Sequence, residues 1–253
     1  MKQTLKWLRE RPIAHRGLHN SDAGIPENSL AAFAAAVADG YGAELDVQAS
    51  ADGQAMVFHD WRLVRMTGAD GGIGDHNVAA LAGLRLQQSR QYIPTLAQVL
   101  GLIAGSAPVI IEIKSEPSQP GGAEEAAFRD LQNYDGPFAV TSFNPRSLAW
   151  FRERAPTWPR GQNSGSRHMP AGLPFWRRLA RRFLIDVDRA RPDFVVYDGL
   201  DLPCMASSWV RAAGKPLLTF TVRDRAEMRR LAPYTDNIIF EGFSSLMGRQ
   251  LDS

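Results

Sequence analysis

Eight short apolar runs, separated by segments with helical periodicity, place the strongest constraint on how this 253-residue chain folds. Runs of this kind are typical of buried strands, and their alternation with helices indicates repeated βα units around a parallel sheet. Eight units favour a closed α/β barrel over an open doubly wound sheet. The expected strands are Pro12 to His15, Ala43 to Val47, Val109 to Lys114, Phe138 to Ser142, Arg160 to Asn163 (the weakest pattern), Phe194 to Tyr197, Leu217 to Val222 and Ile238 to Glu241.

The segments between these runs contain the helical patterns. We expect helices at Leu30 to Asp39, Thr95 to Ile103, Ala123 to Asn133, Ser147 to Arg154, Ser207 to Ala213 and Arg225 to Leu231. One interval breaks the alternation, because a strand-like Ala55 to Asp60 is followed by a polar, glycine-rich stretch. We interpret residues 61–92 as a small insertion within one domain that covers residues 1–253. Its run Gly71 to Gly74 lacks the spacing of a phosphate-binding loop and predicts turns.

Composition and charge exclude several classes of protein. The formal net charge is +2 and the pI about 8.8, which is too mild to indicate a nucleic-acid partner without a clustered basic surface. The lone Cys204 excludes an intrachain disulfide and a thiolate zinc cluster. With no targeting signal and no apolar run near the roughly 18 residues of a membrane span, a cytoplasmic location is the default expectation. The sequence does not predict an oligomeric state.

Charged residues occur where two of the expected strands end. In a strand, alternate residues share a face, so Glu44 and Asp46 point the same way, as do Glu112 and Lys114. Unpaired ionised groups in a core would be very costly. In an α/β barrel the carboxyl ends of the strands carry the reactive residues, so this pattern predicts a site there.

Three carboxylates gathered in a confined site repel one another unless a cation neutralises them. Glu44, Asp46 and Glu112 offer hard oxygen ligands, which suit Mg²⁺ or Ca²⁺ better than zinc or copper. The sequence does not choose between those two ions. The structural alternative is that Glu112 and Lys114 form a buried ion pair and that Glu44 caps a neighbouring helix. We favour the metal site because the two strands carry the pattern jointly.

The ends of two strand-like runs also carry histidines. Cleaving a phosphodiester requires activation of an attacking oxygen and protonation of an alkoxide leaving group, and imidazoles do both near neutral pH. We therefore predict that His15 and His59 form a general acid and base pair, in an order the sequence does not fix. Arg16 can bind two phosphate oxygens, and Lys114 adds a point charge. The other histidines, His19, His76 and His168, we expect on the surface or in loops.

At this point the chain resembles the glycerophosphodiester phosphodiesterase family. The motifs that carry the resemblance lie in about the first 145 residues and are His15-Arg16-Gly17, Pro26-Glu27-Asn28-Ser29 with Phe33, Glu44-Leu45-Asp46-Val47, Asp52-Gly53, His59-Asp60, Ile93-Pro94-Thr95-Leu96, Glu112-Ile113-Lys114 and Ser142-Phe143. The resemblance implies a TIM (β/α)₈ barrel with a small insertion after His59-Asp60. It implies the hydrolysis of small-molecule glycerophosphodiesters, such as deacylated phospholipids, to glycerol 3-phosphate and an alcohol.

The resemblance implies the same site roles as the residue chemistry. They are His15 and His59 as acid and base, Glu44, Asp46 and Glu112 as ligands of a divalent cation, and Arg16 and Lys114 as phosphate binders. Glu27 and Asn28 belong to a matching motif, but we favour the simpler interpretation that Asn28 or Ser29 caps the following helix.

The carboxyl-terminal half departs from the family pattern. Where the family often has a tryptophan on the seventh strand, this chain has Phe220, which we expect to line the substrate pocket. The eighth strand ends with Glu241 and Gly242, where the family commonly has an aspartate and a nearby proline. These changes leave the predicted chemistry intact and bear on the preference for the alcohol.

Residues 160–191 contain eight arginines against two aspartates. Within them, Phe175, Trp176, Leu179, Ala180, Phe183 and Leu184 recur at helical spacing opposite Arg177, Arg178, Arg181 and Arg182. Such a helix suits an anionic membrane surface, where it would give access to lysophospholipids. We favour a barrel helix with a solvated basic face, because every barrel helix needs an apolar stripe for the sheet. A non-catalytic barrel that binds phosphate or lipid headgroups is a further alternative.

Overall fold

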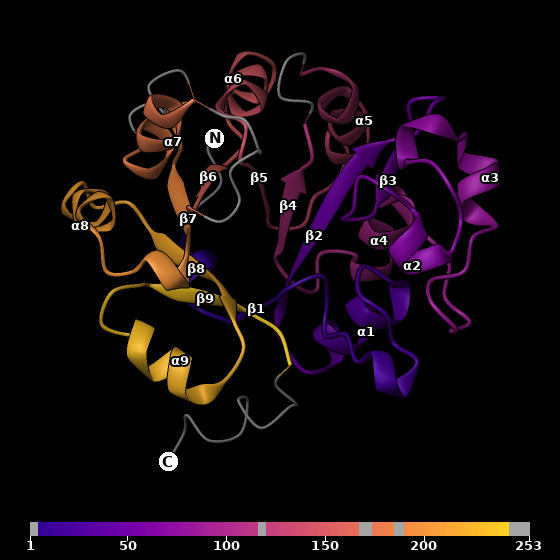
Figure 1. Cartoon of the computed structure of the whole chain (residues 1–253), viewed down its shortest axis with the longest axis horizontal. Helices are drawn as coiled ribbons and strands as arrows, with labels where there is room; N and C mark the ends of the chain where they lie inside the picture. The colour runs from indigo at the N-terminus through magenta and orange to yellow at the C-terminus, as the bar shows by residue number, and fades with distance from the viewer. Residues whose placement is uncertain (1–4, 116–119, 167–173, 185–189, 243–253) are drawn as a thin grey trace.

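Eight parallel strands close into a barrel in the computed structural model, which describes residues 5–115, 120–166, 174–184 and 190–242 (Figure 1). The barrel strands are β1 (Ile13–Ala14), β2 (Gly42–Ala49), β4 (Val109–Ile113), β5 (Phe138–Ser142), β6 (Arg160–Ser164), β7 (Phe194–Asp198), β8 (Leu217–Val222) and β9 (Asn237–Phe240). Each pairs in parallel with the next, and the short β1 pairs with both β2 and β9. The predicted (β/α)₈ barrel and all eight of its expected strands are confirmed.

Helices surround the strands on the outside of the barrel (Figure 1). They are α1 (Leu30–Ala38), α4 (Leu96–Ile103), α5 (Gly122–Leu131), α6 (Pro145–Arg154), α7 (Phe175–Arg182), α8 (Met205–Ala212) and α9 (Arg225–Leu231). Several begin at side chains that accept a backbone N–H, such as Ser29 for α1, Thr95 for α4 and Asp224 for α9. None of the described helices combines the length and apolar character needed to cross a lipid bilayer.

The barrel interior has an apolar layer beneath a polar one. Inward-facing residues such as Ile13, Ile110 and Leu218 form a buried cluster, to which Trp7 of the 3₁₀ helix η1 (Lys6–Arg9) also belongs. Gly42 leaves room for this packing, because a Cβ at that position would lie 2.5 Å from Ile13 Cδ1. Further along the strands the inward positions become polar, and the site is built there.

The segment that we interpret as an insertion lies, together with β3, on one side of the barrel (Figure 1). Strand β3 (Ala55–Val57) pairs antiparallel with β2, and α2 (Val64–Thr67), a 3₁₀ turn η3 (Ile73–Asp75) and α3 (Val78–Ala82) follow it. These elements enclose their own apolar cluster, which includes Met56, Phe58, Leu63 and Leu81. The remaining short 3₁₀ segments are η2 (Ser21–Ala23) and η5 (Gly199–Asp201).

Helix α7 forms where the arginine-rich periodicity predicts it, but its apolar stripe does not pack along its whole length. Phe175 and Trp176 are 74% and 62% exposed, whereas Leu179 and Phe183 are half-buried. The Tyr197 hydroxyl of β7 donates to the Arg182 carbonyl, which fixes the last turn of α7 on the sheet. The expectation of a continuous stripe against the barrel is therefore wrong for the first turn. His168 lies outside the described residues.

Candidate active site

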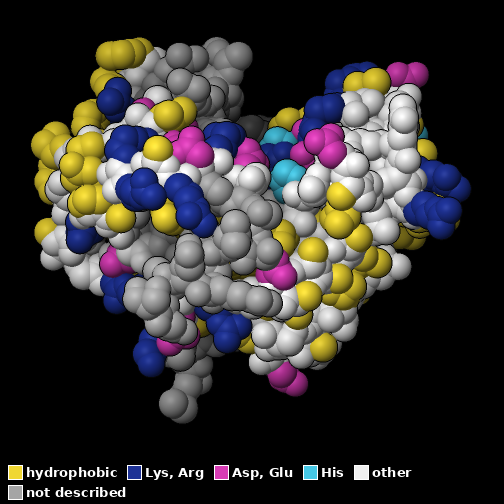
Figure 2. Space-filling view, turned by 90° about the horizontal axis from the view of Figure 1, so that it is seen from below, with side chains coloured by type: hydrophobic (Ala, Val, Ile, Leu, Met, Phe, Trp, Pro, Cys, Tyr) yellow, Lys and Arg dark blue, Asp and Glu magenta, His cyan; other side chains and the backbone are white. Residues whose placement is uncertain are grey.

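All eight residues singled out from the sequence line one pocket at the carboxyl ends of the strands. They are His15, Arg16, Glu44, Asp46, His59, Glu112, Lys114 and Phe220. Figure 2 shows a hollow on the upper edge of the molecule where histidine, acidic and basic side chains gather. The strands bring these residues together because their carboxyl ends meet on the same face of the barrel.

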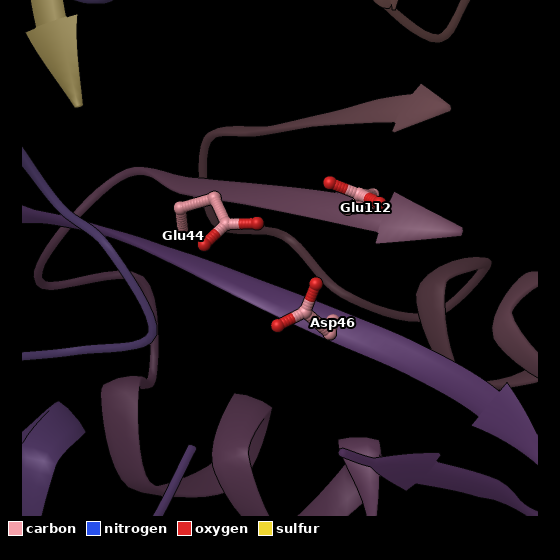
Figure 3. Close-up of side chains that lie close together, drawn as sticks. All are labelled: Glu44, Asp46 and Glu112. Atoms are coloured by element: carbon pink, nitrogen blue, oxygen red, sulfur yellow. The ribbon is translucent and has the colours of Figure 1, made fainter. Parts of the chain in front are cut away.

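The three carboxylates lie close to one another inside the barrel (Figure 3). Glu44 and Asp46 alternate on the inner face of β2, and Asp46 is in register with Glu112 on β4. One oxygen from each of the three side chains lies within 4.8 Å of the others, and each residue is at least 92% buried. Three hard oxygen donors at this spacing could hold a metal ion.

The electrostatics of Glu44 support that fit. Burial raises the pKa of Glu44 well above its ordinary value, and the neighbouring charges of Asp46 and Glu112 raise it further. Glu44 accepts a hydrogen bond from the backbone N–H of Arg16 at 3.1 Å, and no described lysine or arginine forms an ion pair with it. Because this buried carboxylate forms no ion pair with a described lysine or arginine, a bound cation would stabilise its ionised form.

Lys114 sits among the carboxylates. Its ammonium contacts Glu112 Oε1 and lies 2.9 Å from Asp46 Oδ1. Burial alone would raise the pKa of Asp46, but Lys114 and then Arg16 outweigh it and hold the pKa far below its ordinary value. The Glu112–Lys114 ion pair of the structural alternative therefore exists within the acidic trio. Its companion, a helix cap by Glu44, is wrong because Glu44 binds the Arg16 backbone in a turn.

His15 follows β1 and faces the acidic trio. Its Nε2 lies 3.9 Å from Glu44 Oε2, and its Nδ1 lies 2.8 Å from Glu241 Oε2. Burial lowers the pKa of His15, and the contact with Glu241 opposes that shift. The imidazole thus has one nitrogen toward the pocket and the other on a carboxylate.

His59 follows β3 and is held in a similar way. Its Nδ1 lies 2.7 Å from Asp60 Oδ1, and Asp60 also accepts hydrogen bonds from the Arg65 guanidinium. Arg65, on α2 of the insertion, donates as well to Glu27 at 2.6 Å, and Glu27 accepts from Arg16 at 2.8 Å. A continuous chain of charged contacts therefore connects the two sides of the pocket through the insertion.

The neutral wall of the pocket consists of Phe143, Phe220, Thr141 and Asn163, and Arg223 also lines the pocket. The rings of Phe143 and Phe220 meet edge to face with centroids 5.9 Å apart. The buried Asn163 on β6 donates to Glu112 Oε2 at 3.1 Å, while Asn163 Oδ1 and Thr141 Oγ1 have no hydrogen-bond partner among the described residues. This wall offers an apolar surface with two free acceptors beside the charged half.

Comparison with known proteins identifies the family. A model of the glycerophosphoryl diester phosphodiesterase family matches residues 15–240. The chain belongs to this family. A glycerophosphodiester phosphodiesterase of Caldanaerobacter subterraneus subsp. tengcongensis is 34% identical over 154 residues, which are 57% of this chain and 62% of that relative. The alignment thus spans less than two thirds of that relative's length.

Other relatives match over more of their length. A glycerophosphodiester phosphodiesterase of Bacillus subtilis is 26% identical over 92% of this chain and 84% of its own. The solved structure of an Oleispira antarctica phosphodiesterase in complex with the product sn-glycerol-3-phosphate has a TM-score of 0.79 at 25% identity, and covers 97% of this chain and 98% of its own. A Thermotoga maritima glycerophosphodiester phosphodiesterase has a TM-score of 0.69 at 24% identity, covering 91% of this chain and 94% of its own, and shows the same fold.

Sequence reasoning misjudged some residues around the site. Ser29 is the helix cap, as predicted, but Asn28 is not, because its Nδ2 donates to Asp46 Oδ2 at 2.9 Å. His19 lies in a loop, one of the two expected placements, but its side chain is largely buried, with Nε2 3.9 Å from Glu241. His76 does lie in a loop of the insertion, with a ring nitrogen 3.1 Å from the Asp70 carbonyl.

Three further residues received no site role from the sequence: Arg65, Asn163 and Glu241. Each acts on a partner that is distant along the chain, as Asn163 does on Glu112. The only hints were the family motif at Glu27 and the departure from the family pattern at Glu241.

Proposed function

We propose that this chain, working as one domain with residues 61–92 as an insertion, hydrolyses small glycerophosphodiesters to glycerol 3-phosphate and an alcohol. The observation that carries the proposal is the meeting of two carboxylate-bound imidazoles, three buried carboxylates and two cations in one pocket. The relatives named for this activity support it, as does the product in the Oleispira antarctica structure.

The donor set of Glu44, Asp46 and Glu112 suits a divalent cation that prefers oxygen, which we propose to be Mg²⁺ or Ca²⁺. When bound, such an ion would offset the charge of the trio and stabilise negative charge that develops on the phosphate. Arg16 and Lys114 line the same half of the pocket, so both can bind non-bridging phosphate oxygens.

We assign the proton transfers to the two imidazoles. Because Nδ1 of each ring is held by a carboxylate, Nε2 is the nitrogen left for the substrate. One neutral imidazole accepts the proton of the attacking oxygen, and the other, protonated, donates to the departing alkoxide. The proposal gives one role to each of His15 and His59 without fixing their order. A cyclic phosphate product would identify a substrate hydroxyl, rather than water, as the attacking group.

The neutral wall is the proposed site for the organic part of the substrate. Phe143 and Phe220 give an apolar surface, and the free acceptor oxygens of Thr141 and Asn163 suit hydroxyl groups such as those of glycerol. Because Phe220 replaces a tryptophan that is common in the family, we expect this wall to set the preference for the alcohol.

The test is hydrolysis of glycerophosphocholine and related diesters, read out by product identity. Chelation should abolish turnover, and added Mg²⁺ or Ca²⁺ should restore it. His15→Ala and His59→Ala should each lower kcat by about 10²- to 10⁴-fold. His76→Ala, a change in a loop histidine of the insertion, is the matched control and should retain activity. Full activity with chelator present would refute the metal assignment, and substrate binding without product would instead support a non-catalytic binding barrel.

A second candidate function has one observation in its favour. Large exposed apolar side chains lie on α7, η5 and α8, and the sequence of α7 is rich in arginine: they are Phe175, Trp176, Leu200, Met205 and Trp209. In a β/α barrel the first turns of the helices lie at the same end as the pocket, so such a surface suits an enzyme that acts on lysophospholipids in an anionic membrane. Co-sedimentation with anionic vesicles should then occur and should weaken in Trp176→Ala. Vesicles that leave the protein in solution would exclude this candidate.

A further inference from the structure

Glu241 directly follows β9 and makes a contact that spans nearly the whole chain. Its Oε2 lies 2.8 Å from Nδ1 of His15, a residue 226 positions earlier. The family match ends at residue 240, and the sequence departs from the family pattern at this strand end. The residue that holds one of the two pocket imidazoles is therefore not among those that the matched family motifs assign.

The carboxylate of Glu241 is fixed from its other side. Arg223, which follows β8, places its Nε 2.8 Å from Glu241 Oε1, and its guanidinium also donates to the Thr221 carbonyl at 3.2 Å. Each oxygen of Glu241 thus has its own partner, and the two neighbouring strand ends hold the carboxylate in one orientation. Because one oxygen is bound to Arg223, the carboxylate cannot turn away from His15 without losing that ion pair.

This arrangement decides which nitrogen of His15 faces the pocket. A carboxylate only accepts hydrogen bonds, so Nδ1 of His15 must carry the hydrogen that it shares with Glu241. The hydrogen bond with His15, and then the nearby His19, hold the pKa of Glu241 far below its ordinary value, so the group remains an acceptor. Nε2 of His15 is then left toward Glu44 and the pocket.

The second imidazole has the same construction from unrelated residues. His59 Nδ1 contacts Asp60, and Arg65 binds Asp60 from the other side. The repetition of imidazole, carboxylate and guanidinium on both sides of one pocket argues that each carboxylate serves its histidine rather than packing alone.

We propose that Glu241, clamped by Arg223, is a positioning residue that fixes the tautomer and orientation of His15 for proton transfer. This inference rests on the proposed function of the site, and it adds a functional pair from the carboxyl-terminal half of the barrel.

The test compares Glu241→Gln with the wild type by steady-state kinetics. The amide keeps the shape of the side chain but no longer demands a hydrogen on Nδ1, so kcat should fall by about 10²- to 10⁴-fold, as for other carboxylate partners of catalytic histidines. KM should change by less than about 3-fold, because Glu241 is not placed on the substrate. Glu10→Gln makes the same chemical change in a carboxylate paired with Lys6, and should match the wild type.

A double-mutant cycle tests the clamp. Arg223→Gln should lower kcat in the same direction by a smaller factor, and the double variant should be no slower than Glu241→Gln alone, because Arg223 acts through Glu241. Additive losses of kcat in the double variant would overturn the proposed clamp. A kcat of Glu241→Gln that equals the kcat of Glu10→Gln would overturn the positioning role of Glu241. A rise in KM with kcat unchanged would overturn it as well.

A spectroscopic readout separates this proposal from the proposed function. With ¹⁵N-labelled histidine, and His15 assigned from a His15→Gln sample, the wild-type ring should show its hydrogen on Nδ1 and an unprotonated Nε2 when neutral. Glu241→Gln should show a mixture of tautomers. A wild-type ring with its hydrogen on Nε2 would refute the inference, whereas correct tautomers in an inactive wild type would refute only the proposed function. Unchanged thermal unfolding midpoints in each variant would exclude misfolding as the cause.

Discussion

Replacing Lys114 with methionine tests the claim that the acidic trio needs positive charge. Methionine has a similar length and no charge, so the substitution removes the ammonium that contacts Asp46 and Glu112 while it largely preserves volume. The Lys114 side chain is 13% exposed and that of Asp46 is 2% exposed, so water cannot take the place of the lost partner.

The expected loss follows from this burial. Removing one partner of a buried ion pair typically costs about 3 to 5 kcal/mol, because the remaining charge is left uncompensated. For a chain of this size, each kcal/mol lowers the unfolding midpoint by about 2 to 4 °C. With chelator present, Lys114→Met should therefore unfold about 6 to 20 °C below the wild type. A divalent cation at 100 times its Kd adds about 2.7 kcal/mol to the folded state and should recover much of that loss.

The assay is thermal unfolding followed by circular dichroism, with chelator and with Mg²⁺ or Ca²⁺, for the wild type and two variants. Lys6→Met is the control, because Lys6 is 83% exposed and pairs with Glu10 at 3.5 Å, so its loss should stay below about 0.5 kcal/mol. An unfolding midpoint of Lys114→Met close to that of Lys6→Met would show that the trio does not need positive charge for stability. A midpoint that Mg²⁺ or Ca²⁺ does not raise would show the same.

Three further outcomes follow from the structure. With chelator present, the raised pKa of Glu44 means that wild-type stability falls as pH rises from about 4.3 through that pKa. Glu44→Gln should therefore flatten the curve of unfolding midpoint against pH. Parallel curves for the variant and the wild type would contradict the argument from burial. Arg65→Met should lower kcat by about 10- to 100-fold, because it frees the Asp60 carboxylate that holds His59. It should cost little stability, because Arg65 is half-exposed. Activity assays measure the first effect and unfolding curves the second. Gly42→Ala should destabilise the protein by about 1 to 3 kcal/mol in denaturant titrations, because its Cβ would meet Ile13. Ile13→Val in the same chain should recover part of that loss. No recovery would show that the contact with Ile13 is not the cause.

The strands and the charged half of the pocket could be predicted because both depend on local rules. Alternation along β2 and β4 places the carboxylates on the inner face of the barrel. Residues at the carboxyl ends of the strands lie together at one end of the barrel. Strand β6 gave a weak signal because its buried positions are polar, and their partners are not visible locally. Gln162, for example, donates to the Ser142 carbonyl at 3.0 Å.

The rest of the site depends on contacts that no local pattern encodes. Glu241 reaches His15 only after the last strand closes the barrel beside the first, and Arg65 reaches Glu27 only after the insertion has packed. The exposure of Phe175 and Trp176 likewise depends on where the first turn of α7 lies beyond the sheet, whereas helical periodicity alone predicts burial.

The charged contacts of Arg65 give the insertion a consequence for evolution and engineering. A shortened chain without residues 61–92 would retain every barrel strand and both histidines, yet Glu27 and Asp60 would lose the guanidinium that they share. Mutations within residues 61–92, outside the barrel strands, should then change kcat. Swapping residues 61–92 between homologues would change the charged contacts that hold His59, while the barrel strands stay the same.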